Sequence, residues 1–458
     1  MITSPVFTGK RYAVLGLARS GLATVRALIE SGALIAAWDE RAEARAILTP
    51  GATLGDPMAI DLTGFDGIVV SPGVPLNTHP IAARAAAAGV PVIGDIELFA
   101  QARASLPAHK VVGITGTNGK STTTALIHHI LVTAGVPTTM GGNIGLPIMG
   151  QEALTPNANG VGVYVLELSS FQIDLTHSLD CDVAVLTNIT PDHLDRYEGF
   201  DGYAASKARL FAMQRPGQVA VIATDDPTSA DFARSLAMPR AEPLALDGAF
   251  GARMPLPTLP VSPTVVPVSG ADTGDQSTWP ALQGPHNAQN VAVAVAAARL
   301  LGIGEDAIEH GLRTYPGLPH RMERVAEIDG VLYVNDSKAT NATSAAPALA
   351  AYPKVHWILG GRRKTDDLDA CAPHYGHVVA AYTIGESAEL YKELLLRAGI
   401  YAIDTGTLEA AVRQAAAVAR PGETVLLSPA CASYDQFRDY EARGDAFKAA
   451  VAMLGGRI

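Results

Sequence analysis

The sequence predicts an α/β protein of three domains: a Rossmann-like N-terminal domain, a central domain like the phosphate-loop ATPases, and a Rossmann-like C-terminal domain. One arrangement recurs, a short apolar run followed by a glycine turn and a helical pattern, at residues 11–24, 110–124 and 354–367. Parallel strands that lead into helix N-termini produce this pattern. The chain has 458 residues, of which 48% are hydrophobic and 17% charged, and this is enough for several buried cores.

The expected domain boundaries follow the segments between these patterns. A helix and linker over 96–110 end the first domain, and the prolines and glycine of 315–325 suggest a second hinge. Segment 240–285 is rich in Pro, Gly, Thr and Asp, so we expect loops and short strands there and assign it no chemistry. The expected domains are 1–100, 101–316 and 317–458.

Charge and cysteine content limit the classes of partner. The formal net charge of -11 argues against a nucleic-acid or anionic-membrane surface. The three cysteines, Cys181, Cys371 and Cys431, match no metal-ligand spacing and suit a reducing compartment. No apolar run reaches the roughly 18 residues of a membrane span, and the N-terminus lacks the features of a signal peptide. We expect a cytoplasmic monomer that acts on small molecules.

Segment 111–124, VVGITGTNGKSTTT, has the parts of a phosphate-binding loop. An apolar strand ends in glycines that expose backbone N–H groups, Lys120 can reach phosphate oxygens, and Ser121 starts a helix where a Mg²⁺ ligand is required. The spacing departs from G-x-x-x-x-G-K-[ST], because Ile114 stands where the first glycine is expected. A tight turn with an exposed lysine is the structural alternative.

Polar residues also end two other apolar strands of the central region. Glu167 ends one strand, and Asn188, Asp192 and His193 follow the next, before a helical segment that contains Lys207. Carboxylate and other hard ligands at the ends of neighbouring strands favour a Mg²⁺–nucleotide site over isolated buried acids. Asn287 and Asn290 stand at the start of an Ala/Val helix, where capping by Asn287 is the structural alternative.

The N-terminal region nearly spells a dinucleotide-binding fingerprint. Gly16, Ala18 and Gly21 approximate G-x-G-x-x-G, and Asp39 ends the following strand. Ala18 replaces the middle glycine, whose missing Cβ allows close approach of a pyrophosphate. A dehydrogenase is therefore disfavoured, whereas a nucleotide-sugar site remains open.

GTNGKST resembles the ATP loop of the Mur ligase family, the amide-forming enzymes that build the peptide stem of bacterial cell-wall precursors, and of their folylpolyglutamate synthetase relatives. LELSSFQ, NITPDHLDRY, MGGNIGLP, NDSKATN and SPACASYDQF resemble the D-glutamate-adding branch of this family in all three domains. The Asp-Asn-Pro-Arg motif of the branches that add diaminopimelate or lysine is absent. The resemblance implies ATP-dependent joining of D-glutamate to UDP-N-acetylmuramoyl-L-alanine through an acyl phosphate. A folylpolyglutamate synthetase-like enzyme that adds L-glutamate and a non-catalytic nucleotide-binding scaffold are the alternatives.

The resemblance also implies site residues. The catalytic residues are then Lys120, Glu167, His193 and Lys207, and two Mg²⁺ ions are held by Ser121, Glu167, His193 and Lys207. The ATP site comprises Thr117, Asn118, Gly119, Lys120, Ser121, Thr122, Thr123, Asn287, Asn290, Arg321 and Asp336, the last two from the C-terminal domain. The UDP-sugar site comprises Arg19, Ser20, Asp39, Glu40, Arg41, Gly73, Asn77 and Asn143. The D-glutamate site comprises Lys338, Thr340, Lys364, Ser433 and Tyr440.

Two of these roles have notable alternatives. The resemblance implies that CO₂ carbamylates Lys207, because an ammonium group beside Mg²⁺ and a phosphate-bound lysine would be repelled; a surface helix lysine is the alternative. Arg321 is expected to complete the ATP site when the C-terminal domain closes, and a hinge ion pair is the alternative.

The expected D-glutamate site departs from the family pattern at two places. Tyr440 stands where phenylalanine is frequent, and Arg362 and Arg363 precede Lys364 in a loop whose composition is unusual for the family. The alternative for Lys338 is a solvated turn lysine, although the polar residues around it favour a ligand loop.

Overall fold

The computed structural model describes residues 1–238 and 263–455, and the chain forms two compact units. The first unit comprises residues 1–275 and 287–314, and the second comprises 276–286 and 315–458. The first contains two parallel sheets and the second contains one mixed sheet. The three-domain α/β fold predicted from the sequence is confirmed.

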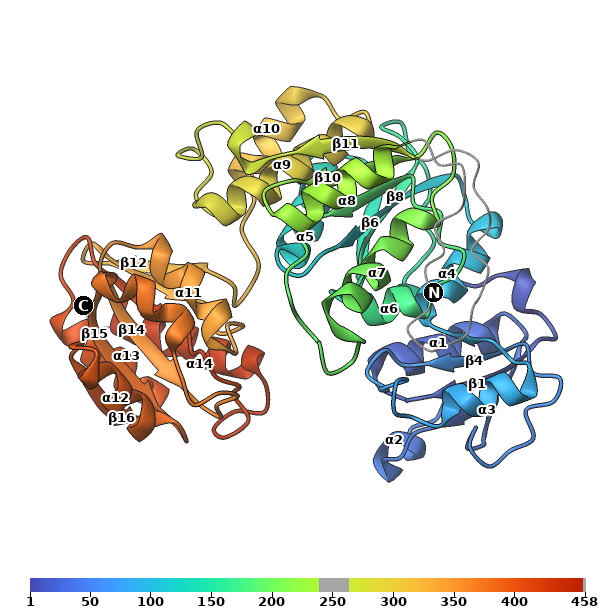
Figure 1. Ribbon diagram of the computed structural model, residues 1–458, viewed down its shortest axis with the longest axis horizontal. Helices are drawn as coiled ribbons and strands as arrows, with labels where there is room; N and C mark the ends of the chain where they lie inside the picture. The colour runs from blue at the N-terminus through green and yellow to red at the C-terminus, as the bar shows by residue number, and fades with distance from the viewer. Residues whose placement is uncertain (239–262, 456–458) are drawn as a thin grey trace. The chain divides into compact units, whose positions relative to one another are not determined.

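The N-terminal sheet has five parallel strands in the order β3-β2-β1-β4-β5 (Figure 1). Its strands are β1 (Arg11–Leu15), β2 (Leu34–Trp38), β3 (Ala52–Leu54), β4 (Gly67–Val70) and β5 (Val92–Ile93). The helices of this domain are η1 (Pro5–Phe7), α1 (Arg19–Glu30), α2 (Ala42–Ala46), α3 (Ile81–Ala88), α4 (Asp95–Ala102) and η2 (Arg103–Ser105).

Alternate residues of β1 supply two cores, one on each face of this sheet. Tyr12 and Val14 belong to the core that includes α1 and α4, whereas Ala13 and Leu15 belong to the core that includes α3. Both sets are buried because side chains of a strand point alternately to the two faces of a sheet. The continuous apolar character of β1 therefore follows from helices on both sides.

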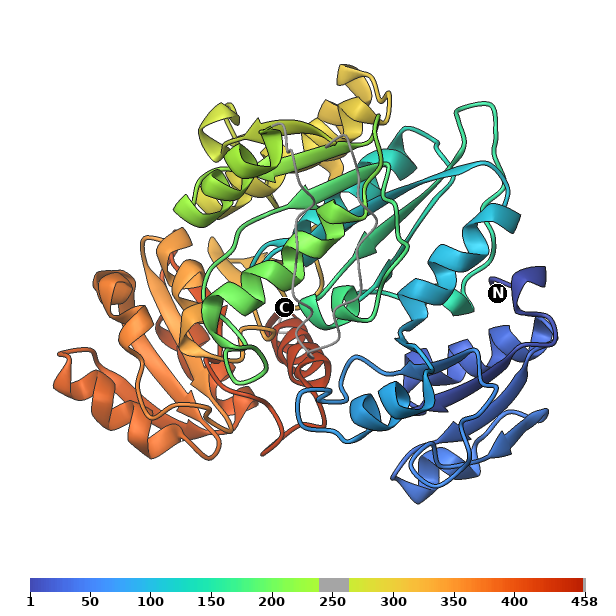
Figure 2. The same cartoon turned by 45° about the vertical axis from the view of Figure 1, so that its right-hand side comes forward.

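The central sheet has six parallel strands in the order β11-β10-β9-β6-β8-β7, with helices on both faces (Figures 1 and 2). The strands are β6 (His109–Thr115), β7 (Thr138–Gly142), β8 (Gly162–Glu167), β9 (Val183–Leu186), β10 (Val219–Ala223) and β11 (Thr264–Val268). The helices are α5 (Lys120–Thr133), η3 (Ile148–Gly150), α6 (Ser170–Asp174), α7 (Gly199–Ala212), α8 (Pro227–Ala237), η4 (Gly270–Asp272), α9 (Pro285–Leu300) and α10 (Glu305–Thr314).

The C-terminal sheet has six strands in the order β12-β13-β17-β14-β15-β16, and only the β12–β13 pair is antiparallel. The strands are β12 (Glu323–Ile328), β13 (Val331–Asn335), β14 (Val355–Gly360), β15 (Val378–Ile384), β16 (Ala402–Gly406) and β17 (Thr424–Leu427). The helices are α11 (Ala342–Ala351), η5 (Asp369–His377), α12 (Ala388–Arg397), α13 (Leu408–Val418) and α14 (Tyr440–Gly455).

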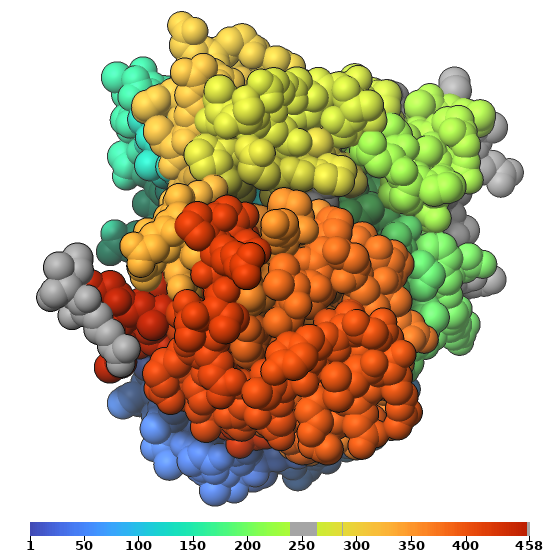
Figure 3. All heavy atoms as spheres, turned by 90° about the vertical axis from the view of Figure 1, so that its left-hand side faces the viewer, coloured from blue at the N-terminus to red at the C-terminus, as the bar shows by residue number. Residues whose placement is uncertain are grey.

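Two cores lie on the faces of the C-terminal sheet. Trp357 belongs to the core shared with α11 and α12, and the next residue, Ile358, belongs to the core shared with α13 and α14. The side of this unit that faces the viewer in Figure 3 is an unbroken surface of its orange and red segments.

The parallel strands all run in one direction, so the loops that follow β13, β14 and β17 lie at the same edge of the sheet.

Two expectations about individual segments can be compared with the structure. Of the loop-rich segment 240–285, residues 239–262 lie outside the described residues, and the described remainder contains one short strand, β11, as expected. No helix among the described residues is long and apolar enough to cross a membrane.

Candidate active site

The glycine-rich loop between β6 and α5 has a backbone that only glycine adopts readily. Gly116 has φ 147° and Gly119 has φ 83°. A Cβ on Gly116 would collide with the Thr187 hydroxyl, and one on Gly119 would collide with the side-chain oxygen of Asn290. The strand, glycine turn and helix that the sequence predicted are therefore present and closely packed.

Side chains from the neighbouring strand hold this loop in place. Asn188 accepts from the backbone N–H of Asn118 at 2.8 Å and donates to its carbonyl at 3.1 Å. The Thr187 hydroxyl donates to the same carbonyl at 2.6 Å. The hydroxyl groups of Thr117 and Tyr203 lie 3.2 Å apart. The loop conformation is thus fixed by the protein itself, which reduces the ordering needed when a phosphate binds.

Two lysines converge on one carbonyl of the loop. The Nζ of Lys120 donates to the carbonyls of Gly116 at 2.9 Å and Thr117 at 2.8 Å, and the Nζ of Lys207 donates to Gly116 at 2.9 Å. Lys207 is 2% exposed, and its Nζ lies 4.4 Å from the centre of the Tyr203 ring. Burial, and secondly the charge of Lys120, lower the pKa of Lys207 well below its usual value. The surface-lysine alternative is wrong for Lys207.

Glu167 provides a buried carboxylate at the end of β8. It is 2% exposed, and its Oε1 accepts from the amide of Asn143 at 2.9 Å. Its Oε2 is buried without a hydrogen-bond partner among the described residues. Ser121 is buried in the first turn of α5. An orphaned carboxylate oxygen in a domain with a phosphate loop fits a hard cation such as Mg²⁺.

His193 lies in the loop before α7 and has φ 52°. Its ring centre lies 4.9 Å from that of Phe171 and 6.3 Å from that of Tyr203. Its side chain is about half exposed, and Nε2 lies 3.6 Å from the Asp192 carboxylate. The imidazole therefore remains accessible next to the tyrosine that contacts the phosphate loop.

No group of three or more His, Cys, Asp and Glu side chains is arranged to hold a metal ion in the part of the chain that the structure describes. The expected ligands, Ser121, Glu167, His193 and Lys207, include only two residues of those types. The orphaned oxygen of Glu167 is the observation that fits Mg²⁺ here.

Asn287 and Asn290 lie beside the phosphate-loop helix. Helix α9 begins at Pro285, so Asn287 lies within its first turn and the capping alternative is wrong. The amide of Asn290 donates to Asn287 at 3.1 Å and accepts from the Thr123 hydroxyl at 3.3 Å. Thr122, the other threonine expected at the ATP site, is half-buried in the same first turn of α5.

Except for Asn143, which follows β7 of the central sheet, the expected UDP-sugar residues follow β1, β2 and β4. Asp39 accepts from the N–H of Leu17 at 2.7 Å and from Nε of Arg41 at 3.0 Å. The hydrogen bond from Arg41 is the main reason that the pKa of Asp39 falls to about 2. Gly16 has φ 98°, and a Cβ there would lie 2.6 Å from the Ser71 hydroxyl. Asp39 thus stabilises the glycine turn and positions Arg41.

The other members of this set differ in their contacts and exposure. Arg19 donates to the carbonyl of Gly145 at 3.5 Å, and Asn77 donates to that of Asp195 at 3.3 Å. Gly73 has open space where a side chain would be. Ser20 is half-buried and Glu40 exposed, whereas Asn143 contacts Glu167.

The second unit holds the remaining expected site residues. Asp336 follows β13 and accepts from the Ser428 hydroxyl at 2.8 Å and the N–H of Met322 at 3.2 Å. Burial raises its pKa to about 7. Arg321 lies in the turn before β12, where its N–H donates to Leu318.

Of the five expected D-glutamate residues, the structure brings two into contact. The Nζ of Lys338 lies 5.2 Å from the centre of the Tyr440 ring. Ser433 is buried and its carbonyl accepts from two backbone N–H groups, whereas Thr340 is half-buried. Lys364 is exposed after β14 and makes no hydrogen bond or ion pair with a described residue.

Comparisons with known proteins identify the family. Residues 114–298 match the Mur ligase middle domain, 320–431 match the Mur ligase glutamate ligase domain, and 10–94 match the MurD-like N-terminal domain of Mur ligases. The chain belongs to the Mur ligase family. It is 59% identical to a protein of Novosphingobium aromaticivorans over 99% of this chain and 97% of that protein, and 54% identical to one of Zymomonas mobilis over 99% and 100%. Both relatives are named UDP-N-acetylmuramoylalanine–D-glutamate ligase.

Solved structures share the Mur ligase fold at low sequence identity. The UDP-N-acetylmuramate-alanine ligase of Thermotoga maritima has a TM-score of 0.55 at 16% identity, covering 97% of this chain and 99% of that one. A folylpolyglutamate synthase/dihydrofolate synthase of Yersinia pestis has a TM-score of 0.51 at 19% identity, covering 80% and 93%. These likenesses concern the fold alone.

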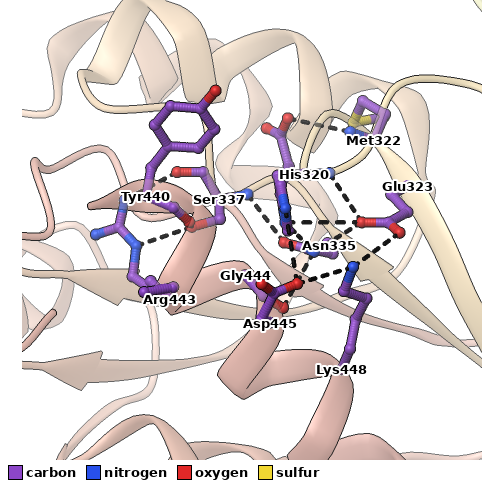
Figure 4. Close-up of polar contacts among 12 residues, drawn as sticks. His320, Met322, Glu323, Asn335, Ser337, Tyr440, Arg443, Gly444, Asp445 and Lys448 are labelled. Atoms are coloured by element: carbon purple, nitrogen blue, oxygen red, sulfur yellow. Dashed lines mark hydrogen bonds and ion pairs between the residues drawn. The ribbon is translucent and has the colours of Figure 1, made fainter. Parts of the chain in front are cut away.

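Arg443 of this Mur ligase was not assigned a role from the sequence. It is 1% exposed and donates to the hydroxyl of Ser337 at 3.0 Å, the carbonyl of Ser337 at 2.9 Å and that of Cys431 at 3.0 Å (Figure 4). One guanidinium group therefore connects the loops after β13 and β17. The signal in the sequence was its position four residues before Phe447, on the buried stripe of α14.

A second polar cluster supports the same loops from the other side. Asn335 donates to Nδ1 of His320 at 3.0 Å and to Glu323 at 2.9 Å (Figure 4). His320 has φ 61°, and its N–H donates to Glu323 at 2.8 Å. Lys448 lies 3.5 Å from Glu323. The cluster fixes the turn that carries Arg321 to the end of β13.

Proposed function

We propose that this Mur ligase adds D-glutamate to UDP-N-acetylmuramoyl-L-alanine and forms ADP and phosphate. The observation that carries the proposal is the full-length identity, above 50%, to relatives named for this activity. The local geometry supports it, since a fixed phosphate loop lies beside buried groups suited to phosphate chemistry. A carboxylate is a poor electrophile, and transfer of the γ-phosphoryl group of ATP converts it into an acyl phosphate that the amine of D-glutamate attacks. The amide forms, and phosphate leaves with the oxygen that it took from the carboxylate.

The chain's contribution to this reaction is to position and neutralise charge. The glycine turn offers backbone N–H groups to phosphate oxygens, and Lys120 turns from its own loop carbonyls toward the β- and γ-phosphates. Ser121, Glu167, His193 and a modified Lys207 would hold Mg²⁺, which supplies further neutralisation of phosphate charge. The roles expected for Arg321 and Asp336 toward the nucleotide stay predictions.

Lys207 is proposed to carry a carbamate. The ammonium group loses one proton, the neutral amine attacks CO₂, a C–N bond forms and a second proton is released, so a cation becomes an anion. The burial of Lys207 and its lowered pKa support this step, because CO₂ reacts with a neutral amine. The carbamate nitrogen retains one N–H, which can still donate to the carbonyl of Gly116.

Transfer of oxygen tests the acyl-phosphate step. UDP-N-acetylmuramoyl-L-alanine labelled with ¹⁸O in its carboxylate is incubated with the protein, ATP, Mg²⁺ and D-glutamate. Mass spectrometry of the released phosphate is expected to show one ¹⁸O per turnover. Unlabelled phosphate together with amide formation would contradict the route.

The chain also offers a test of acceptor binding. Lys338→Ala and Lys364→Ala are each expected to raise the KM for D-glutamate roughly tenfold or more, with much less change in the KM for ATP, because each lysine is proposed to pair with a glutamate carboxylate. Steady-state kinetics with each substrate varied in turn measures both constants.

Arg363→Ala is the matched control for Lys364→Ala, because Arg363 lies in the same loop and pairs with Asp366. It should leave the KM for D-glutamate unchanged. Equal effects on D-glutamate and ATP in the lysine variants would indicate a general folding defect and would remove the proposed roles.

A further inference from the structure

A cavity of about 940 Å³ lies in the first unit, and no residue of the phosphate loop lines it. Its walls come from the segment 76–92, which includes α3, and from the end of α6, the loop before α7 and Arg209 of α7. Asn77 is the one residue of the expected UDP-sugar, ATP and metal sets that lines it. The cavity is large enough for a small organic molecule.

Arg209 lines this cavity with most of its hydrogen-bonding capacity unused. Its side chain is 7% exposed, and its Nη2 donates to the carbonyl of Thr176 at 3.2 Å. Among the described residues, neither Nε nor Nη1 has an acceptor, and no carboxylate lies within 4 Å of the guanidinium group. A buried cation with one hydrogen bond is costly unless an anion or another acceptor reaches it.

Asp174 is an acidic residue at the cavity that could pair with Arg209, but its carboxylate already accepts a hydrogen bond from another residue. The donor of this hydrogen bond is the Tyr197 hydroxyl, at 2.8 Å. Burial raises the pKa of Asp174, and its charge attracts that of Arg209, but no hydrogen bond or ion pair joins the two side chains. The exposed Glu198 is the other acid at the cavity.

Further donors line the cavity. Nδ1 of His79 accepts from the N–H of Ile81 at 3.1 Å, so the neutral ring carries its proton on Nε2. Arg196 donates through one Nη to the carbonyl of Val74 at 3.2 Å, and its guanidinium carbon lies 4.3 Å from the centre of the Phe171 ring. The cavity is thus lined by two arginines and by a histidine with an N–H donor. It is also lined by two acids, and one of them, Asp174, already accepts a hydrogen bond from Tyr197.

The part of the lining that comes from α3 and its flanks is apolar. Small side chains of α3 and the prolines beside it form this wall: Pro80, Ala82, Ala83, Ala86 and Pro91. Such a wall suits the face of a ring, and the arginines suit a carboxylate or phosphate.

We propose that this cavity is a binding site for a small organic anion with a flat apolar body, whose acidic group pairs with Arg209. The occupant would touch the segment after Gly73 and the loop after His193. These two segments are already joined, since Asn77 donates to the carbonyl of Asp195 and Arg196 donates to that of Val74.

Three probes of one shape test the charge requirement. Calorimetric titration of the full chain with 2-naphthoate, 2-naphthyl phosphate and 2-naphthylmethanol is done with ADP and UDP at saturation, so that the nucleotide sites are filled. Each anion is expected to bind with 1:1 stoichiometry and about tenfold or more tighter than the alcohol. The tighter of the two anions identifies the preferred acidic group.

A pair of variants locates the binding. Ala86 and Ala87 are both exposed on α3, and only Ala86 lines the cavity. Ala86→Trp is expected to fill the cavity and to weaken 2-naphthoate about tenfold or more, whereas Ala87→Trp should bind it as the parent does. Arg209→Met should remove the preference for the anion over the alcohol.

The contrary outcomes are specific. Equal binding of alcohol and naphthoate would remove the role of Arg209, and equal binding by the two tryptophan variants would place the site elsewhere. If the parent chain does not bind the probes at millimolar concentration, the proposal is overturned. Water would then be the remaining hydrogen-bond partner of Arg209. Because these tests measure binding without turnover, they stand apart from the proposed ligase reaction, and the tryptophan pair decides the result even if Arg209→Met does not fold.

Discussion

Replacing Lys120 with alanine is expected to lower kcat by about 10³-fold or more, with the fold intact. Its amine lies at the glycine turn, where it donates to the carbonyls of Gly116 and Thr117. The negative charge on the transferred phosphoryl group is spread differently in the transition state than in ATP, and a fixed cation stabilises that state. Single-turnover measurement of phosphate release gives the change in the chemical step.

Lys354→Ala is the control for Lys120→Ala, because Lys354 is an exposed lysine of the second unit. It should retain the parent rate. Near-normal turnover by Lys120→Ala, with thermal melting unchanged in both variants, would contradict the phosphate-loop assignment.

Lys207→Ala is expected to be nearly inactive and to regain part of its activity when acetate or formate is added. The alanine leaves a buried space beside the carbonyl of Gly116, and a short carboxylic acid can place an anion where the carbamate is proposed. Phosphate release is measured against acid concentration, and ¹³C NMR of the parent chain in ¹³CO₂ should show a carbamate signal that the variant lacks.

The same acids added to Lys120→Ala provide the matched control. They should restore nothing there, because the missing group is a cation. Parent-level activity of Lys207→Ala without any acid would remove the carbamate from the account, and so would rescue of both variants to the same extent.

The local parts of the site could be predicted from the sequence. The strand, turn and helix around Gly116 and Gly119 are contiguous in the chain, and only glycine adopts those backbone angles readily, so the pattern is visible in a few residues. Glu167 could be placed at a strand end because its apolar run is short and uninterrupted. The same reasoning applies to central strands such as β4, β8 and β9, which are largely apolar runs buried on both faces.

The parts that depend on contacts distant in sequence could not be predicted in this way. The hydrogen bonds of Asn118 with Asn188 and of Arg443 with Ser337 join residues 70 and 106 positions apart. The helical segment with Lys207 and Arg209 reads as an ordinary amphipathic helix, since the sequence does not show that both side chains are covered by other elements. The burial of these side chains depends on tertiary packing. The roles proposed for Lys207 and Arg209 both depend on this burial.

The most direct test is acceptor-dependent phosphate release by the purified chain. The protein is mixed with ATP, Mg²⁺ and UDP-N-acetylmuramoyl-L-alanine, and D-glutamate, L-glutamate or no amino acid is added. A parallel reaction replaces the nucleotide sugar with a dihydropteroate substrate and L-glutamate. The account predicts phosphate and amide product with D-glutamate and the nucleotide sugar, and little release in the other mixtures. Release that requires L-glutamate and the pterin, or that is the same without an amino acid, would contradict it.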